Sequence, residues 1–259
     1  MKLFLIKRKL LTAVACLLVA AGMFYIVNHP AIVGASATTR QLPIYCVQRD
    51  QKVLSISFDA AWGNEDTQQL IDILGKYNVK ATFFVVGDWV DKYPESVKAL
   101  SDAGHEVMNH SNTHAHMSQL SRDEIIADVE ACNDKIEAVT GVRPTLIRPP
   151  YGEYDDNVVT AIRSIGMEPI QWDVDSLDWK DLAAPDITKR VLKGVQPGSI
   201  VLFHNAALHT PEALPGIIEA LLQDGYTFVP ISQIILPGQC GVDYTIDHTG
   251  RQLPAIAAQ

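Results

Sequence analysis

Two histidines four residues apart, His110 and His114, are the residues whose type and spacing first point to chemistry. Imidazoles at this spacing can face the same side of a helix, and each neutral ring offers a nitrogen lone pair to a divalent metal ion. The spacing lacks the adjacent glutamate of a zinc-protease helix, and many such pairs are only surface residues. The pair alone does not decide between a metal site and a surface pair, so the rest of the chain must supply its partners.

The elements that must position this pair follow from the hydrophobic pattern. Short runs rich in β-branched and aromatic residues alternate with helical patterns, one of which opens with a capping box from Ser121 to Glu124. This alternation predicts a parallel α/β sheet or barrel. The predicted strands are Val53–Phe58, Ala81–Val86, Glu106–Asn109, Thr145–Arg148, Glu168–Asp173, Ser199–His204 and Tyr226–Val229.

Reactive side chains fall at the carboxyl ends of these predicted strands. In a parallel barrel, all such ends converge on one face, where active sites are built. A capping Asp or a salt-bridged Arg could explain any one of them, but titratable groups gathered on one face indicate a functional site. The residues are Asp59, His110, His114, Arg148, Asp175, Asp178 and His204.

Five motifs in a fixed order carry a resemblance to a known family between about Lys52 and Ile235. The chain resembles the polysaccharide deacetylases of the NodB-homology, carbohydrate esterase 4 type, which implies a distorted (β/α)7 barrel. Each motif alone is weak evidence, whereas all five in order are specific. They are Ser57–Gly63 (SFDAAWG), His110–His114 (HSNTH), Arg148–Gly152 (RPPYG), Asp175–Trp179 (DSLDW) and Leu202–Asn205 (LFHN).

The resemblance implies a role for the residues of the first three motifs. His110 and His114 would hold a divalent metal, zinc in the first place with cobalt or manganese as alternatives, which would acidify bound water and polarise the amide oxygen. Asp59 would be the general base that takes the proton of the water. Arg148 would pair with Asp59 and favour its ionised form. Together these residues would activate the attacking water.

The remaining roles concern the oxyanion, the leaving group and the substrate. The resemblance implies that the backbone N–H of Tyr151, beside Pro150, helps to hold the oxyanion. His204 would protonate the departing amine, oriented by Asp175. Trp179 would form an apolar wall against the acetyl methyl group. The implied reaction is hydrolysis of an N-acetyl amide bond.

One position departs from the family pattern in a way that matters for the metal. The first motif of the family usually reads Asp-Asp, and its second Asp completes the set of metal ligands, whereas this chain has Ala60. Two histidines and water would bind a metal more weakly than two histidines and a carboxylate. In the fifth motif, Asn205 replaces a frequent Asp. Candidates for the missing ligand are Asp59, Asn64, Glu65 and Asp66.

The N-terminus predicts export to the outside of the membrane. Lys2 and Lys7–Lys9 precede a run without charge from Leu10 to Val27, which is long enough to span a bilayer as a helix. We expect residues 1–28 to form an uncleaved single-pass membrane anchor, although Ala35–Ala37 could mark a cleavage site that releases a secreted protein. Residues 29–50 are expected to be a linker, 51–236 the deacetylase domain and 237–259 a loosely attached polar tail.

Composition limits the partners and the redox chemistry. The 259 residues have a formal net charge of −9 and 47% hydrophobic content, which predicts a buried core and argues against a nucleic-acid partner. Of four cysteines, Cys16 lies in the apolar run. Cys46 and Cys240 flank the patterned region and are candidates for a disulfide bridge.

Two functions from different classes remain open. The first is metal-dependent deacetylation of a wall polysaccharide, with peptidoglycan as substrate and spore formation as the setting, because the variant Asp59–Gly63 resembles a membrane-anchored, sporulation-associated subgroup. The second is a glycan-binding protein that keeps the fold but has lost turnover, motivated by Ala60. A serine hydrolase is disfavoured because the chain has no Gly-x-Ser-x-Gly motif. The pattern leaves the sugar and the oligomeric state undetermined.

Overall fold

The computed structural model describes residues 14, 16–25 and 40–255, and the chain divides into two units, Met1–Arg40 and Gln41–Gln259. In the first unit, residues 14 and 16–25 are helical and exposed. No helix within the described ranges is both long and apolar enough to cross a membrane. Most of the predicted anchor and the first part of the predicted linker lie outside the described residues.

The second unit is built around a sheet of parallel strands in the order β6-β5-β4-β3-β2-β8-β7, with β9 paired to β2. The predicted parallel α/β architecture is therefore confirmed, and the strands form a half-barrel, in which the distortion of the expected (β/α)7 barrel is that its two end strands, β6 and β7, do not pair. The strands are β2 (Val53–Ala60), β3 (Thr82–Val85), β4 (Glu106–Asn109), β5 (Leu146–Ile147), β6 (Glu168–Pro169), β7 (Val174–Asp175), β8 (Ile200–His204) and β9 (Thr227–Phe228).

The predicted strand Glu168–Asp173 is the one that differs. The structure has two strands there, β6 and β7, at opposite ends of the strand order. Between them, Ile170 pairs with Ile44, and the carboxylate of Asp173 accepts a hydrogen bond from the backbone N–H of Ile200 at 2.8 Å. The chain thus crosses from one end of the strand order to the other here, and its polar groups are satisfied by Ile44, which precedes β1, and by Ile200 at the start of β8, as burial requires.

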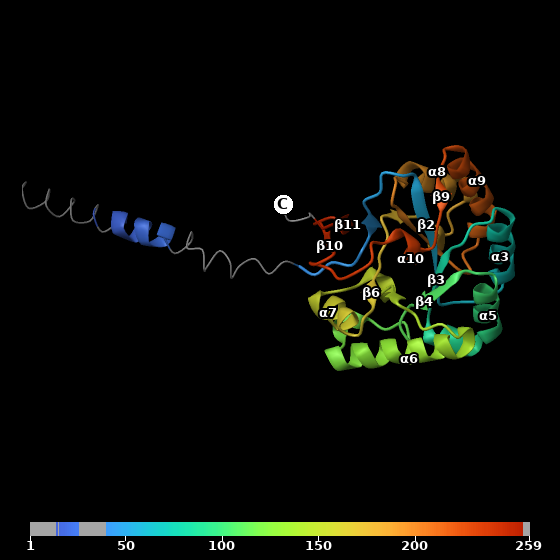
Figure 1. Ribbon diagram of the computed structural model, residues 1–259, viewed down its shortest axis with the longest axis horizontal. Coiled ribbons are helices and arrows are strands. Elements are labelled where there is room, and N and C mark those ends of the chain that lie inside the picture. Colours follow the sequence, from blue (N-terminus) through green and yellow to red (C-terminus); the bar gives the residue numbers. More distant parts are fainter. Residues whose placement is uncertain (1–13, 15, 26–39, 256–259) are drawn as a thin grey trace, which may run out of the picture. The chain divides into compact units, whose positions relative to one another are not determined.

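Helices surround the strands, as Figure 1 shows, with α3, α5, α6, α7, α8 and α9 on the outside. The predicted capping box is confirmed at the start of α6, where Ser121 and Glu124 exchange side-chain to backbone hydrogen bonds. The helices are α3 (Thr67–Lys76), α4 (Gly87–Lys92), α5 (Pro94–Asp102), α6 (Arg122–Thr140), α7 (Asp156–Ser164), α8 (Ala184–Gly194), α9 (Thr210–Gln223) and α10 (Ile231–Ile234), with short 3-10 turns η1 (Met117–Gln119), η2 (Pro150–Gly152) and η3 (Asp178–Lys180).

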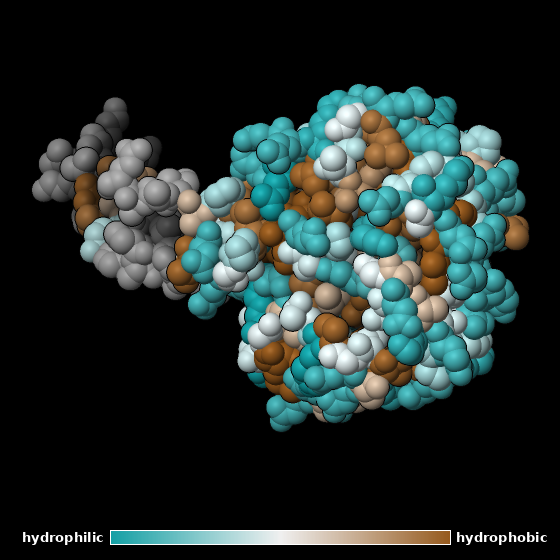
Figure 2. Space-filling view, turned by 45° about the vertical axis from the view of Figure 1, so that its right-hand side comes forward, coloured by the Kyte–Doolittle hydropathy of each residue, from teal (hydrophilic) through white to brown (hydrophobic). Residues whose placement is uncertain are grey.

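Strand β2 separates an apolar side from a polar side. Ile56, Phe58 and Ala60 belong to the main apolar cluster, and the ring of Phe58 stacks on that of Phe83 with centroids 4.7 Å apart. Successive side chains of a strand point to opposite faces, so Ser57 and Asp59 face the other way. The apolar core therefore anchors one face of β2, while Ser57 and Asp59 on the other face point to the inside of the barrel. On the face that Figure 2 shows, hydrophilic residues and hydrophobic patches are interspersed.

A second sheet shows that the predicted tail is not loosely attached. It has three strands in the order β1-β11-β10, namely β1 (Cys46–Val47), β11 (Arg251–Pro254) and β10 (Tyr244–Ile246). Gln252 is fully buried, and its side-chain amide exchanges two hydrogen bonds with the backbone of Leu236. Strand β1, which pairs with β11, lies in the predicted linker. The folded domain therefore begins before residue 51 and includes much of the predicted tail.

The predicted disulfide bridge is absent. Cys46 and Cys240 are both free thiols, the first buried and the second half-buried. Cys46 pairs with Arg251 along β11, whereas Cys240 lies beside Tyr244 on the far side of the same small sheet. Backbone pairing, rather than a covalent link, holds the two ends of the domain together.

Candidate active site

The parallel strands bring the predicted site residues to one edge of the barrel. Asp59 at the end of β2 is in register with His204 at the end of β8, and Asn109 at the end of β4 is in register with Ile147 of β5. His110 and Arg148 follow these last two residues directly. The convergence expected from the strand-end pattern is therefore confirmed for Asp59, His110, Arg148 and His204.

Asp59 is buried and held by an ion pair with Arg148. The Nη1 atom of Arg148 lies 2.7 Å from Oδ1 of Asp59, and its Nη2 donates to Ser57 Oγ at 2.9 Å and to the carbonyl of Gln171 at 3.1 Å. Burial alone would raise the pKa of Asp59, but the charges of Arg148, His110 and His204 outweigh it and hold that pKa below its usual value. Asp59 is thus an ionised base at neutral pH.

The histidine pair lies in a loop and not on a helix, which corrects the expected geometry. Ser111 and His114 have positive φ angles of 67° and 56°, so the chain from His110 to His114 cannot form a regular helix. The loop nevertheless brings the two rings together, with centroids 5.1 Å apart. Its backbone is tied to α6, because Asp128 accepts a hydrogen bond from the N–H of Asn112 at 2.8 Å.

Gly87 shows how tightly this loop is packed. Its backbone N–H donates to the carbonyl of Ser111 at 3.0 Å, and Asp88 donates to that of Asn112 at 2.9 Å. A Cβ atom at Gly87 would lie 3.0 Å from the backbone of Asn112. Glycine is therefore required for α4 to approach the loop closely enough to make these bonds.

The two histidines are suited to ligate a divalent metal through neutral rings. Nδ1 of His110 lies 2.6 Å from the carbonyl oxygen of Arg148, so Nδ1 carries the hydrogen and Nε2 keeps its lone pair. Nδ1 of His114 is buried and has no hydrogen-bond partner among the described residues. Burial, aided by the neighbouring His110, lowers the pKa of His114 to about 4. Both rings thus fit a metal as donors.

No third protein ligand completes the pair. The described part of the chain contains no group of three or more His, Cys, Asp or Glu side chains arranged to hold a metal. Asp59 Oδ2 is 3.5 Å from Nε2 of His110, and Ala60 is buried in the apolar cluster. Asn64 donates to Ser96 Oγ at 3.0 Å, and Asp66 accepts from the N–H of Ala206 at 2.9 Å. The donor set therefore fits a two-imidazole site. Asn64 and one carboxylate oxygen of Asp66 are engaged in other hydrogen bonds, whereas Oδ1 of Asp66 is buried without a partner among the described residues.

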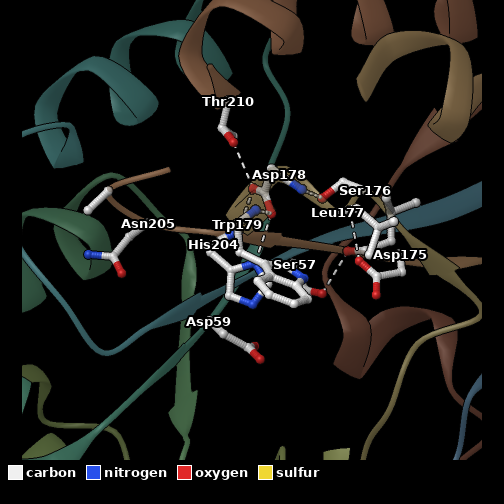
Figure 3. Close-up of polar contacts among 12 residues, drawn as sticks. Ser57, Asp59, Asp175, Ser176, Leu177, Asp178, Trp179, His204, Asn205 and Thr210 are labelled. Atoms are coloured by element: carbon white, nitrogen blue, oxygen red, sulfur yellow. Dashed lines mark hydrogen bonds and ion pairs between the residues drawn. The ribbon is translucent and has the colours of Figure 1, made fainter. Parts of the chain in front are cut away.

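His204 is oriented by Asp178 and not by Asp175, which corrects the implied role of Asp175. Nδ1 of His204 lies 2.8 Å from Oδ1 of Asp178, and Oδ2 of Asp178 accepts from Thr210 Oγ1 at 2.7 Å. Asp175 instead accepts from the N–H of Leu177 at 2.8 Å. Figure 3 shows the ring of His204 between Asp178 and Asp59, with Asp175 directed elsewhere. Asp175 is the last residue of β7, but the turn after it directs the carboxylate of Asp178 to the histidine.

The environment of His204 suits an acid. Burial alone would lower the pKa of His204, but the hydrogen bond and charge of Asp178, with smaller contributions from Asp59 and Asp175, raise it above its ordinary value. Thr210, the first residue of α9, was not identified from the sequence, because no local pattern marks a hydroxyl 32 residues away as the partner of Asp178.

The remaining predicted residues line the same edge. Tyr151 has a positive φ of 60°, and its ring stacks on that of His116 with centroids 4.3 Å apart. Pro150, before it, is buried, while the side chain of Trp179 is exposed. A left-handed backbone at a non-glycine residue is uncommon and concentrates at functional sites. The ring of Tyr151 lies 4.4 Å from that of His114 between centroids, so this turn is next to the histidine pair.

Comparisons with known proteins identify the family of this chain. Residues 47–170 match the polysaccharide deacetylase family model. The peptidoglycan-N-acetylmuramic acid deacetylase PdaA of Bacillus subtilis is 30% identical over 195 residues, covering 74% of each chain. The chain belongs to the polysaccharide deacetylase family, known as CE4.

Two further relatives frame the question of activity. The peptidoglycan-N-acetylmuramic acid deacetylase PdaC of Bacillus subtilis is 37% identical over 188 residues, which are 73% of this chain but 40% of that longer protein. A CE4 family pseudoenzyme from Bacillus anthracis is 38% identical in its crystal structure, with a TM-score of 0.72 over 74% of this chain and 68% of the other. A mutant of that pseudoenzyme with restored enzymatic activity is 39% identical, with a TM-score of 0.71 over 74% of this chain and 70% of the other. The family therefore includes both active and inactive members of similar structure.

Proposed function

We propose that this protein removes acetyl groups from a cell-wall polysaccharide by hydrolysing their amide bonds to the sugar nitrogen, with peptidoglycan as the substrate. The observation that carries the proposal is the placement of two proton-transfer groups with opposite pKa shifts on one edge of the barrel. Arg148 lies 2.7 Å from Asp59 and lowers the pKa of that carboxyl, and Asp178 lies 2.8 Å from His204 and raises the pKa of that imidazole. A base and an acid with diverging pKa values are what amide hydrolysis requires.

The reaction uses these groups in order. Asp59 takes a proton from water as the water oxygen attacks the acetyl carbonyl carbon, and the carbonyl oxygen becomes an oxyanion that the backbone N–H of Tyr151 helps to hold. His204 then gives a proton to the amide nitrogen as its bond to carbon breaks. The products are acetate and a glycan with a free amine. Each proton-transfer group contributes a rate factor on the order of 10²–10⁴.

A divalent metal would be held by His110 and His114, whose neutral rings suit zinc, with cobalt and manganese as alternatives. When bound, such an ion polarises a carbonyl oxygen and lowers the pKa of water. Because Ala60 offers no donor, we infer that this site binds its metal more weakly than a site with two histidines and a carboxylate. Activity is accordingly expected to depend on added metal.

The proposal is tested by measuring acetate release from N-acetylated peptidoglycan and from chitooligosaccharides. The protein is first treated with a chelator and then supplied with zinc, cobalt or manganese. We expect release that depends on metal and is lost in Asp59→Asn, which removes the base while keeping the size of the side chain. Absence of release with every metal and every glycan would contradict the proposal.

A second candidate function is glycan binding without turnover. It is favoured by Ala60, whose methyl group lies in the apolar cluster where a carboxylate ligand is expected, and by the similarity to a CE4 pseudoenzyme. A missing ligand in the metal site is costly for metal affinity. Glycan binding that is the same with and without metal, together with no acetate release, would favour this function.

We further propose that the domain acts outside the cytoplasmic membrane, in spore formation or wall remodelling. The support for the location is the cluster of positive residues before the apolar run Leu10–Val27. The support for the setting is the resemblance of the Asp59–Gly63 motif to a sporulation-associated subgroup. Fractionation of cells that express the full chain, with protease treatment of intact protoplasts, tests the location. The domain is expected in the membrane fraction and accessible from outside.

A further inference from the structure

The loop after Asp59 is held by the side chains of two buried residues, Asn205 and Trp89. The side-chain amide of Asn205 donates to the carbonyl oxygens of Trp62 at 2.9 Å and Gly63 at 2.6 Å, and it accepts from the N–H of Ala61 at 3.2 Å. The indole N–H of Trp89 donates to the same two carbonyls, at 2.6 and 2.8 Å. Asn205 and Trp89 are both buried. The backbone of residues 61–63 is therefore fixed from two sides.

This arrangement gives Asn205 a definite role. An amide can donate two hydrogen bonds and accept others, whereas an ionised carboxylate can only accept. An Asp at this position would set a negative charge against two carbonyl oxygens and leave both of them with Trp89 alone. The Asn that departs from the family pattern thus matches the conformation of the loop after Asp59.

The fixed loop carries a side chain that contributes little to the core. The indole of Trp62 is 65% exposed, although the backbone beneath it is held by two buried residues. Its ring lies edge to face with that of His114, with centroids 5.8 Å apart. Tyr151 and Trp179 are exposed on the same edge of the barrel. Trp62 thus offers an exposed aromatic face beside the histidine pair, on a backbone segment that Asn205 and Trp89 hold.

We propose that Trp62 is a binding platform for a sugar ring adjacent to the one that is deacetylated, so that the site recognises a chain of N-acetylated hexosamines rather than a single sugar. The proposal rests on the proposed function, because it takes the glycan as the ligand of this edge. The flat, uncharged face of an indole suits the C–H surface of a pyranose ring, and the pair buries apolar area from water. A clamped loop lowers the conformational entropy that such binding costs.

The test measures binding without turnover. In the Asp59→Asn background, the affinity for chitooligosaccharides of two to six sugars is measured by isothermal titration calorimetry, with and without the added substitution Trp62→Ala. We expect Trp62→Ala to weaken binding of the longest oligomer about tenfold and of the disaccharide less than twofold. Trp62→Phe, which keeps an aromatic face, is expected to recover part of the affinity.

Two further variants separate a platform from a general effect. Val242 is as exposed as Trp62 and lies in the turn before β10, so Val242→Ala is the matched control and should leave binding unchanged. Asn205→Asp should weaken binding of long oligomers by releasing the loop, with Trp62 still present. Thermal unfolding of each variant verifies that it is folded.

The outcomes distinguish the platform from the proposed function. Equal affinity of the parent and Trp62→Ala for every oligomer, with binding retained, would overturn the platform and leave the deacetylase proposal standing. Equal weakening by Trp62→Ala for the disaccharide and the hexasaccharide would also overturn it, because the residue would then contact the central sugar. No binding of any glycan by the parent would overturn both.

Discussion

His204 and Asp178 are joined twice, through Nδ1 and through the backbone N–H, with each nitrogen 2.8 Å from a carboxylate oxygen. This double contact fixes the ring and leaves Nε2 as the nitrogen that can reach a substrate. It also ties the end of β8 to η3, so that the acid and its supporting carboxylate cannot move independently. Asp178 therefore contributes more than Asp175 to the ring orientation and the raised pKa of His204.

We predict that Asp178→Asn lowers the kcat of deacetylation by about 10²-fold, because the acid loses the charge that keeps it protonated. Asp175→Asn should change kcat by less than about threefold, since its side chain accepts a hydrogen bond from Leu177 instead. Steady-state kinetics on chitooligosaccharides under saturating metal make the comparison. Equal losses in the two variants would refute the assignment of Asp178.

The pH dependence of kcat should report the raised pKa of His204. A histidine with a raised pKa stays protonated to higher pH, so kcat should fall only as the pH rises through that raised value. Asp178→Asn removes the main group that raises the pKa and should move this alkaline limb to lower pH. Measurement of kcat from pH 5 to 10 in the wild type and in Asp178→Asn tests the direction in which the alkaline limb moves. A limb that stays in place would mean that another group titrates.

Restoring a carboxylate at residue 60 should exchange stability for metal affinity. Ala60 is 1% exposed and packs in the apolar cluster, so Ala60→Asp without metal is expected to cost about 2 kcal/mol, or roughly 4–8 °C in Tm for a domain of this size. Zinc should recover most of this loss and should bind the variant more tightly than the wild type.

Calorimetry with a chelator and with zinc measures both effects in Ala60→Asp. The matched control is Ala161→Asp in α7, an equally buried alanine that lies away from the histidines and should not be rescued by zinc. Unchanged zinc affinity in Ala60→Asp would mean that another group already completes the coordination.

The small sheet at the C-terminus should contribute to global stability. Gln252→Ala removes the amide that satisfies the backbone N–H and carbonyl of Leu236, and two partly buried groups without partners cost about 2 kcal/mol. Urea unfolding at pH 7 should show a lower midpoint with an unchanged slope. Gln239→Ala, at an exposed position in the same segment, should change stability by less than about 0.5 kcal/mol.

The parts of the fold that the sequence predicts are those with local signals. Strand β2 alternates apolar residues with Ser55, Ser57 and Asp59, and α6 opens with the capping box at Ser121, so both were identified from neighbouring residues. The split between β6 and β7 carries no such signal, because it depends on Ile44 and Ile200 reaching across from distant parts of the chain. The small sheet was missed for the same reason, since β10 and β11 are short strands rich in polar residues.

The candidate site follows the same division. Asp59, His110, Arg148 and His204 were identified because each follows a strand, and parallel topology then forces convergence. The sequence order of Asp175 and Asp178 did not show which of the two carboxylates bonds to His204. It depends on η3 turning the backbone after Asp175, with Leu177 in a left-handed conformation at φ 54°. Side-chain partners such as Thr210 and Asn205 likewise depend on the three-dimensional packing of loops.

The central claim, that Asp59 and His204 drive hydrolysis of an N-acetyl group, is tested most directly by isotope incorporation. N-acetylated peptidoglycan is incubated with the zinc-supplied protein in water enriched in oxygen-18, and the released acetate is analysed by mass spectrometry. We predict acetate that carries one oxygen from the water, formed by the wild type and absent with Asp59→Asn. Acetate formed equally by Asp59→Asn, or no acetate from the wild type, would contradict the account.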